Sequence, residues 1–215
     1  MQFDLFDRGR NEVLGASSYL EFRERLAASG CEKCALAESR SRIVVDRGVP
    51  GTGILAIGEG PGAEEDRLGF AFVGRAGQLF DKILESVGID TNRDMLIANV
   101  VKCRPPENRT PTAKEAEACL PYLRRQIALT RPEVILLLGA TSLRHLDPSK
   151  KEFSMSDEAG RLFTLDGYGA ARFLVLYHPA ALLYNAGLKS AMWDHVRALR
   201  RELDALGLPR RPPIA

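Results

Sequence analysis

Four short apolar runs alternate along the chain with longer segments in which apolar residues recur at helical spacing. The runs have the length and bounding residues of buried strands and cover residues 54–57, 95–101, 134–138 and 173–177. The segments between them predict helices at 18–29, from about 79 to 87, from Thr112 onwards and from about 191 to 206. Strands that alternate with helices predict a three-layer α/β/α sandwich with a central four-stranded, mainly parallel sheet.

Some of these elements carry signals at their ends. Thr112 and Glu115 form a capping-box pattern that opens a helix, and Gly30 and Gly88 stand where helices should end. A turn at Asp166-Gly167 predicts a hairpin before the fourth strand. In the last helix we expect a buried face made of Trp193, Val196, Leu199, Leu203 and Leu206.

The length and the apolar content fit one domain. A chain of 215 residues with 45% hydrophobic residues can bury a sizeable core, whereas two full domains would be cramped. We expect a flexible tail over 1–17, a single domain over 18–208 and a second tail over 209–215.

A glycine-rich, acidic stretch from Gly58 to Gly77 follows the first strand. In an open α/β sheet, ligands bind at the carboxyl ends of the strands, so this loop is a candidate site. Its carboxylates would repel a nucleotide's phosphates, and no Gly-Lys-Ser/Thr closes the loop. Backbone donors, acids and the ring of Phe72 suit a flat polar ring better than a phosphate chain.

Two polar residues end other strands at the same predicted edge. Asn99 can both donate and accept along one edge of a base, as the imide edge of a pyrimidine requires, although it could equally satisfy neighbouring backbone. Of the three histidines, His178 is the one placed at the carboxyl end of a strand, where both a catalytic and a purely structural role are open. Lys102, Arg104 and Arg109 form a local positive cluster beside this edge.

The four cysteines occur as Cys31 and Cys34, then Cys103 and Cys119. Cys119 falls inside the helix opened by Thr112, and Cys103 lies on the loop before it. Together the four thiolates would join the N-terminal helix to the central loop. The spacing alone leaves zinc, a [4Fe-4S] cluster and unlinked core cysteines open.

Charge and hydropathy add few constraints. The net charge of +2 shows no global basic field. The N-terminus has no basic region followed by an apolar run, and no window reaches the length of a membrane span. We therefore expect a cytoplasmic protein without membrane contact, in which cysteines are ligands rather than disulfides.

Together these motifs resemble the family 4 uracil-DNA glycosylases, the iron-sulfur branch of that superfamily. The resemblance runs from about Cys31 to Leu206. It is carried by Gly58-Glu59-Gly60-Pro61-Gly62 with Glu65-Asp66, Phe72-Val73-Gly74 with Ala76-Gly77, Asn99-Val100-Val101-Lys102-Cys103-Arg104-Pro105-Pro106 with Asn108-Arg109, His178-Pro179 with Leu182-Leu183, and the cysteine pattern.

The resemblance implies a DNA repair enzyme that hydrolyses the N-glycosidic bond of deoxyuridine by base flipping and leaves an abasic site. It implies a [4Fe-4S] cluster on Cys31, Cys34, Cys103 and Cys119. The expected partner is DNA that contains uracil, and we expect a monomer.

The resemblance also assigns roles to site residues. Phe72 would stack on uracil, Asn99 would read its imide edge, and Glu65 would exclude a methyl group at C5. His178 would hydrogen-bond the uracil O2, and Leu182 would wedge into the gap left by the flipped base.

The position of the water is the least determined part of this assignment. The best-known uracil-DNA glycosylases have an aspartate where this chain has Gly60, which leaves Glu59 and the Gly60 backbone to position water. Phe70-Ala71 replaces a common Arg-Pro, and Ala180 replaces a serine whose hydroxyl could contact a phosphate. Both departures bear on DNA affinity more than on chemistry.

The N-terminal residues Gln2, Phe3, Asp4, Leu5 and Phe6 resemble the short peptide by which bacterial DNA-processing proteins dock on the replication sliding clamp. We take the clamp as a candidate partner.

The competing hypothesis is a non-catalytic iron-sulfur protein for electron transfer or nucleic-acid binding. It explains the cysteines but leaves Phe72, Asn99 and His178 without a common purpose. A relative that traps its product through a histidine in an inserted central loop is excluded, because no histidine precedes His145.

Overall fold

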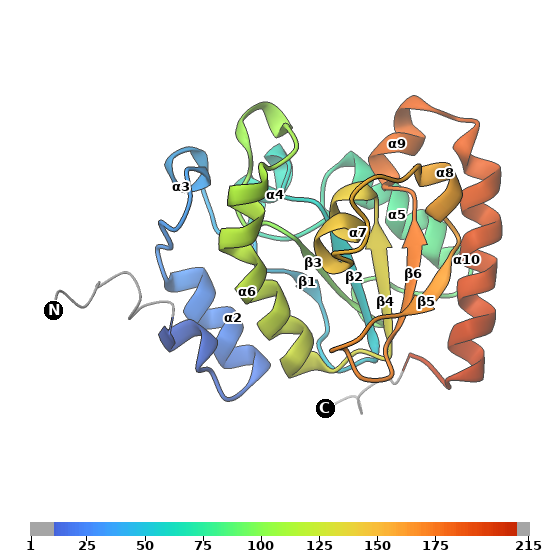
Figure 1. Cartoon of the computed structure of the whole chain (residues 1–215), viewed down its shortest axis with the longest axis horizontal. Coiled ribbons are helices and arrows are strands. Elements are labelled where there is room, and N and C mark those ends of the chain that lie inside the picture. The colour runs from blue at the N-terminus through green and yellow to red at the C-terminus, as the bar shows by residue number, and fades with distance from the viewer. Residues whose placement is uncertain (1–10, 210–215) are drawn as a thin grey trace, which may run out of the picture.

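The computed structural model describes residues 11–209. A six-stranded sheet in the order β1-β3-β2-β4-β6-β5 lies at its centre, with helices on both faces (Figure 1). The strands are β1 (Arg47–Gly48), β2 (Ile54–Gly58), β3 (Leu96–Asn99), β4 (Val134–Leu138), β5 (Leu162–Thr164) and β6 (Arg172–Leu176). The helices are α2 (Tyr19–Ala28), α3 (Leu36–Ser39), α4 (Ala63–Leu68), α5 (Arg75–Glu85), the 3-10 turn η1 (Pro106–Asn108), α6 (Ala113–Thr130), α7 (Ala140–Leu146), α8 (Met155–Glu158), α9 (Pro179–Tyr184) and α10 (Leu188–Ala205).

The predicted α/β/α architecture is confirmed, and the sheet is larger than expected. The four predicted strands pair in parallel as β3-β2-β4-β6. β1 and β5 add an antiparallel strand at each edge. The hairpin of β5 and β6 was predicted. β1 was not, because a two-residue strand is too short to show periodicity.

Alternation along the strands divides the core between the two faces. Leu55 and Ile57 of β2 pack with α2, α6 and α7 on one face, whereas Ile54 and Ala56 pack with α5, α9 and α10 on the other. All five residues of β2 and of β4 are buried, as is usual for parallel strands covered by helices.

The predicted boundary of the N-terminal tail is too late in the chain. Val13 and Ala16 are buried in the core, and Arg125 donates a hydrogen bond to the carbonyl oxygen of Ala16 at 2.5 Å. Residues 11–17 are therefore part of the folded unit. The clamp-like peptide at 2–6 lies outside the described residues.

Candidate active site

The parallel strands bring the predicted polar residues together at their carboxyl ends, the upper edge of the sheet in Figure 1. Gly58 and Asn99, the last residues of β2 and β3, are register partners. Val100 and Val101 continue this pairing, because their N–H groups donate to the carbonyl oxygens of Gly58 and Glu59 at 2.9 and 3.1 Å. The start of the acidic loop is thus held as an extension of the sheet.

Phe72 lies beside Asn99, across Gly58. A Cβ at Gly58 would lie 2.6 Å from Asn99 Oδ1 and 2.6 Å from two ring atoms of Phe72, so only glycine leaves room for both. Phe72 has φ 57°, a backbone conformation rare for a bulky residue. Its carbonyl oxygen would be 1.9 Å from a Cβ at Gly77, so Gly77 makes room for this strained turn.

The amide of Asn99 is buried and unpaired. Its side chain is 1% exposed, and neither Oδ1 nor Nδ2 has a hydrogen-bond partner among residues 11–209. An unpaired buried amide costs free energy, and most such groups in folded proteins have partners. This amide is therefore set to receive a ligand that both donates and accepts.

His178 completes the group. Its ring centroid is 5.8 Å from that of Phe72. The residue is the N-cap of α9, and its Nδ1 accepts the N–H of Ala180 at 3.2 Å. Burial lowers the pKa of His178 to about 4, so the imidazole is neutral near pH 7. With Nδ1 accepting, the ring proton is on Nε2.

The four acids of the loop have different partners. Glu65 accepts the N–H groups of Gly74 and Gly62 at 2.7 and 3.2 Å. Asp66 is buried and accepts from the backbone of Ser41 and Arg42, and Glu64 pairs with Arg67. Glu59 instead accepts a hydrogen bond from the hydroxyl of Thr141. Of the four, Glu59 is the one that accepts from a side-chain hydroxyl at the carboxyl edge of the sheet.

Sequence reasoning missed Thr141. It lies in the first turn of α7, which begins at the carboxyl end of β4, so its position at the ligand edge could be read from the pattern. The pairing with Glu59 could not, because it joins residues that are far apart in the chain.

Leu182 does not occupy the position expected for a wedge. It is 2% exposed and packs in the core on the inner side of α9. The apolar side chains that α9 exposes are Leu183 at 37% and Tyr184 at 89%. Insertion of Leu182 into DNA would require it to leave its packing.

The four cysteines surround one small cavity between the segment at 31–34, the loop after β3 and α6. All four are free thiols. Burial raises the pKa of Cys103 to about 11 and that of Cys119 to about 12. Bound metal must therefore displace their protons.

Hydrogen-bond donors point at these sulfurs. The N–H of Lys102 is 3.3 Å from Cys119 Sγ, and Arg40 Nη1 is 3.6 Å from Cys103 Sγ. Tyr122 Oη is 3.5 Å from Cys31 Sγ. Donors of this kind stabilise thiolate ligands.

Within residues 11–209, no group of three or more His, Cys, Asp or Glu is arranged to hold a single metal ion. A single zinc ion needs all its sulfurs about 2.3 Å from one point. The four sulfurs therefore do not form a preset single-ion site among residues 11–209.

Lys102 connects the cysteine cavity with the amide site. The side chain is buried, and Nζ donates to the carbonyl oxygen of Asn99 at 2.8 Å and to Gln126. Burial lowers the pKa of Lys102 to about 8. Two members of the predicted positive cluster therefore have structural partners. Lys102 is buried and bonded inside the fold, and Arg109 forms an ion pair with Glu115 at 2.7 Å.

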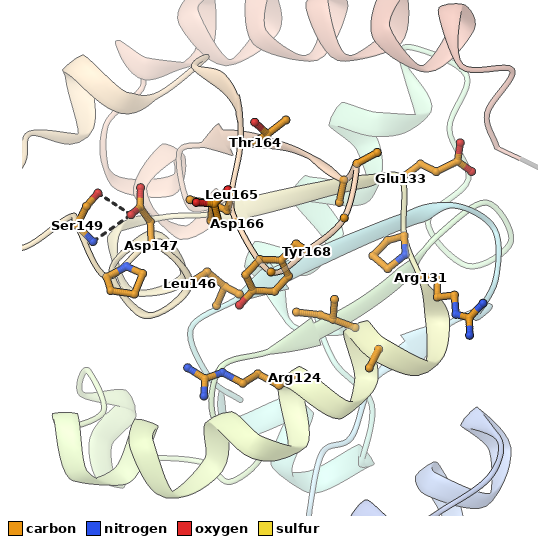
Figure 2. A pocket seen from close by; sticks show the side chains of 18 residues that line it. Arg124, Arg131, Glu133, Leu146, Asp147, Ser149, Thr164, Leu165, Asp166 and Tyr168 are labelled. Atoms are coloured by element: carbon orange, nitrogen blue, oxygen red, sulfur yellow. Dashed lines mark hydrogen bonds between the residues drawn. The ribbon is translucent and has the colours of Figure 1, made fainter.

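A larger cavity of about 1110 Å³ lies elsewhere (Figure 2). Arg124 and Arg131 of the α6 end and Tyr168 of the loop between β5 and β6 line it, together with Glu133, which precedes β4. It is therefore at the amino ends of the strands. None of the predicted site residues lines it, so it is not the site described above.

In the described part of the chain, no helix is long and apolar enough to cross a membrane.

Comparison with known proteins identifies the family. A sequence model of the Uracil DNA glycosylase superfamily matches residues 45–201. The chain is 44% identical over 155 residues to a type-4 uracil-DNA glycosylase of Thermotoga maritima. The aligned region covers 72% of this chain and 79% of that enzyme. The chain is 40% identical over 162 residues to the type-4 enzyme of Pyrobaculum aerophilum, covering 74% and 82%. With the type-4 enzyme of Saccharolobus solfataricus it shares 38% identity over 179 residues, covering 81% and 82%.

Proposed function

Because the chain belongs to the uracil DNA glycosylase superfamily, and within it to the type-4 enzymes, we propose that it excises uracil from DNA with the residues around Asn99. The reaction is hydrolysis of the bond between N1 of uracil and C1′ of deoxyribose in DNA repair. It leaves an abasic site.

The observation that carries this assignment is the unpaired amide of Asn99. Uracil presents an acceptor, O4, beside a donor, N3–H, and one amide satisfies both with Nδ2 and Oδ1. Cytosine presents the opposite pair and would strand two buried polar groups, which costs several kcal/mol. The amide therefore selects the base as well as binding it.

The neighbours of Asn99 hold the ring of the base. Phe72 stacks on it, and the absent side chain of Gly58 lets Phe72 and Asn99 lie side by side. Glu65 excludes the methyl group of thymine at C5. Two backbone N–H bonds fix this carboxylate, so it cannot swing away to admit a larger base.

His178 stabilises the departing base. As the N1–C1′ bond breaks, its electron pair moves onto the uracil ring, and negative charge develops at O2. Neutral His178 donates its Nε2–H to this oxygen, since Nδ1 is already an acceptor. A neutral donor suffices in a pocket from which water is excluded.

Glu59 positions the attacking water. One carboxylate oxygen, Oε2, is engaged by Thr141, which leaves Oε1 for a water that the Gly60 backbone also contacts. The water oxygen bonds to C1′ on the side opposite to the leaving base, and its proton passes to Glu59. Because the sugar is already cation-like when water attacks, orientation contributes more than basicity.

We propose that Cys31, Cys34, Cys103 and Cys119 hold a [4Fe-4S] cluster. Two observations support this: the four cysteines line one cavity, and N–H donors are directed at Cys103 and Cys119. The choice of a cluster over zinc rests on the resemblance to the iron-sulfur branch of the family. When bound, the cluster cross-links four thiolates and so joins the segment after α2 to the loop that follows Asn99. No step of the reaction passes through it.

The unit that performs this reaction comprises Ser18 to Leu208, with residues 11–17 packed onto it, because one sheet supplies both halves of the core. We propose that it acts as a monomer in the cytoplasm, where four unpaired thiols are stable.

The peptide at Gln2 to Phe6 docks the enzyme on the sliding clamp. Deletion of residues 1–7 tests this assignment. We expect loss of binding to a purified clamp with unchanged excision, and unchanged binding would refute it.

Alkaline cleavage of a labelled oligonucleotide that carries one uracil tests the proposed reaction. We expect cleavage at uracil by the wild type and by Asn92→Ala, an exposed control, but not by Asn99→Ala. Oligonucleotides with thymine or cytosine at that position stay intact. Absence of cleavage by protein with intact cluster absorbance would overturn the proposal in favour of a non-catalytic iron-sulfur protein.

A further inference from the structure

Trp193 is more exposed than its place in α10 predicts. The apolar periodicity of the helix places it on the buried face, yet it is 37% exposed while Met192 and Val196 are buried. An indole left partly in water forgoes some of the gain from burial. A single exposed apolar side chain is ordinary, so what surrounds Trp193 decides whether it has a role.

A cavity of about 180 Å³ lies against Trp193, between α5, α9 and α10. Leu182 and Met192 form its buried side, and Lys82 and Lys189 line it as well. Drug-sized ligands occupy pockets of roughly 300–1,000 Å³. This cavity therefore has room for about one planar ring.

The charges around the cavity are positive. Lys82 and Lys189 are exposed, and neither is in an ion pair within residues 11–209. No acidic residue lines the cavity. The two acids next in sequence to lining residues have cationic partners, since Asp194 is 3.3 Å from Arg197 and Asp81 is 2.5 Å from Arg47. A nucleotide complements this arrangement, because its base can enter the apolar cavity while its phosphates lie near the two lysines.

Helix α9 borders both the cavity and the active site. His178 caps the N-terminus of this helix, and Leu182 follows four residues later. A helix rises about 1.5 Å per residue, so the two lie roughly 6 Å apart along the axis. Stacked nucleotides rise about 3.4 Å each, and a strand opened by base flipping extends further. The nucleotide next to the flipped uridine can reach the cavity.

We propose that Trp193 and the cavity beside it bind the base adjacent to uracil in the damaged strand, with Lys82 and Lys189 on its phosphates. The inference rests on the proposed uracil excision, and it adds a second base-binding subsite. A base held there cannot restack on its neighbour, so the subsite favours the flipped state of uridine.

Fluorescence gives the first test, because Trp193 is the single tryptophan of the chain. The probe is an oligonucleotide with an abasic analogue in place of the uridine, which the enzyme cannot cleave. We expect quenching of Trp193 by this oligonucleotide and much less quenching when the adjacent base is also removed. Equal quenching by both oligonucleotides would overturn the proposal.

Kinetics gives the second test. Stacking contributions measured by alanine substitution predict that Trp193→Ala raises KM by about fivefold or more with kcat unchanged. Trp193→Phe retains a ring and should recover most of the loss. Leu162→Ala removes another exposed apolar side chain, 44% exposed on β5, and should leave KM unchanged.

Removing the adjacent base from the substrate should raise KM for the wild type but not for Trp193→Ala, as coupled partners require. Independent effects would overturn the subsite. Lys82→Gln and Lys189→Gln should each reduce the salt dependence of binding by about one counterion. A protein that binds DNA and quenches as expected but releases no uracil would refute the proposed reaction instead, so the two failures are distinguishable.

Discussion

The hydroxyl of Thr141 donates a hydrogen bond to the carboxylate of Glu59. Thr141 lies in the first turn of α7, and Glu59 follows β2, so two parallel strands place the pair at one edge of the sheet. In the proposed mechanism, this bond orients the carboxylate that positions the attacking water. Thr141 is a positioning residue, because it acts through Glu59.

Replacement of Thr141 by valine keeps the shape and removes the hydroxyl. A hydrogen bond to a charged group contributes about 1.5–3 kcal/mol, so we expect kcat to fall roughly tenfold to a hundredfold. KM should change little because the base does not contact Thr141. Thr141→Ser restores the hydroxyl and should recover kcat. Equal kcat for the valine and serine variants would show that the bond plays no part.

Gly58→Ala tests the space between Asn99 and Phe72. The added methyl group would lie 2.6 Å from both side chains, where no real Cβ is found, so one of them must move into the uracil site. We expect single-turnover excision to fall by at least about a hundredfold, since misplacement by 1 Å has this effect on reactions. The control is Gly187→Ala, which meets only the side chain of Asn185, at 3.1 Å. A Gly58→Ala enzyme with normal excision would contradict the placement of uracil.

The meeting of Phe72, Asn99 and His178 could be predicted from the sequence, because parallel strands bring their carboxyl ends to one edge. Residues whose function depends on contacts between distant segments could not. Thr141 is one such residue, and Trp193 is another. Helical periodicity assigns Trp193 to a face, but only the positions of α5 and α9 decide how much of it they cover. Leu182 shows the same limit, because its position after His178 says nothing of whether it faces DNA or core.

The pH dependence of excision tests the state of His178. Burial lowers its pKa to about 4, so the group is neutral above that value and protonates only below it. Protonation at Nδ1 would turn this acceptor into a donor that faces the N–H of Ala180. The ring would then lose the hydrogen bond that orients it, and excision should fall. We expect single-turnover rates without a histidine transition near pH 6.5, the usual pKa. A transition near that pH, absent in His178→Gln, would refute the neutral imidazole.

Alanine variants of Leu182 and Leu183 distinguish a role in core packing from a role in DNA contact. Leu182→Ala opens a cavity in the core and should lower the free energy of unfolding by about 2–5 kcal/mol, measured in urea. Leu183→Ala changes an exposed side chain and should leave stability within about 0.5 kcal/mol. If Leu183 contacts the opened duplex, its variant raises KM on double-stranded DNA more than on single-stranded DNA. A large stability loss from Leu183→Ala alone would reverse this assignment.

If the proposed cluster joins the four cysteines, its loss should loosen the segment between α2 and β1 before the rest of the fold. Cys31 and Cys34 lie on this segment and are partly exposed, whereas Cys103 and Cys119 are buried on the loop after β3 and on α6. Removing iron, or replacing Cys34 by alanine, cuts the cross-link. We expect a fall in Tm of roughly 5–10 °C, which corresponds to about 2–3 kcal/mol for a chain of this size.

Limited proteolysis distinguishes this local effect from general unfolding. Cleavage after Lys33 or Arg40 should appear first, while the fragment that contains α6 persists. Iron removal from Cys34→Ala protein should add little, because the cross-link is already lost. Protection at Lys33 and Arg40 that does not change with iron content would show that the four thiols do not hold this segment through a metal group.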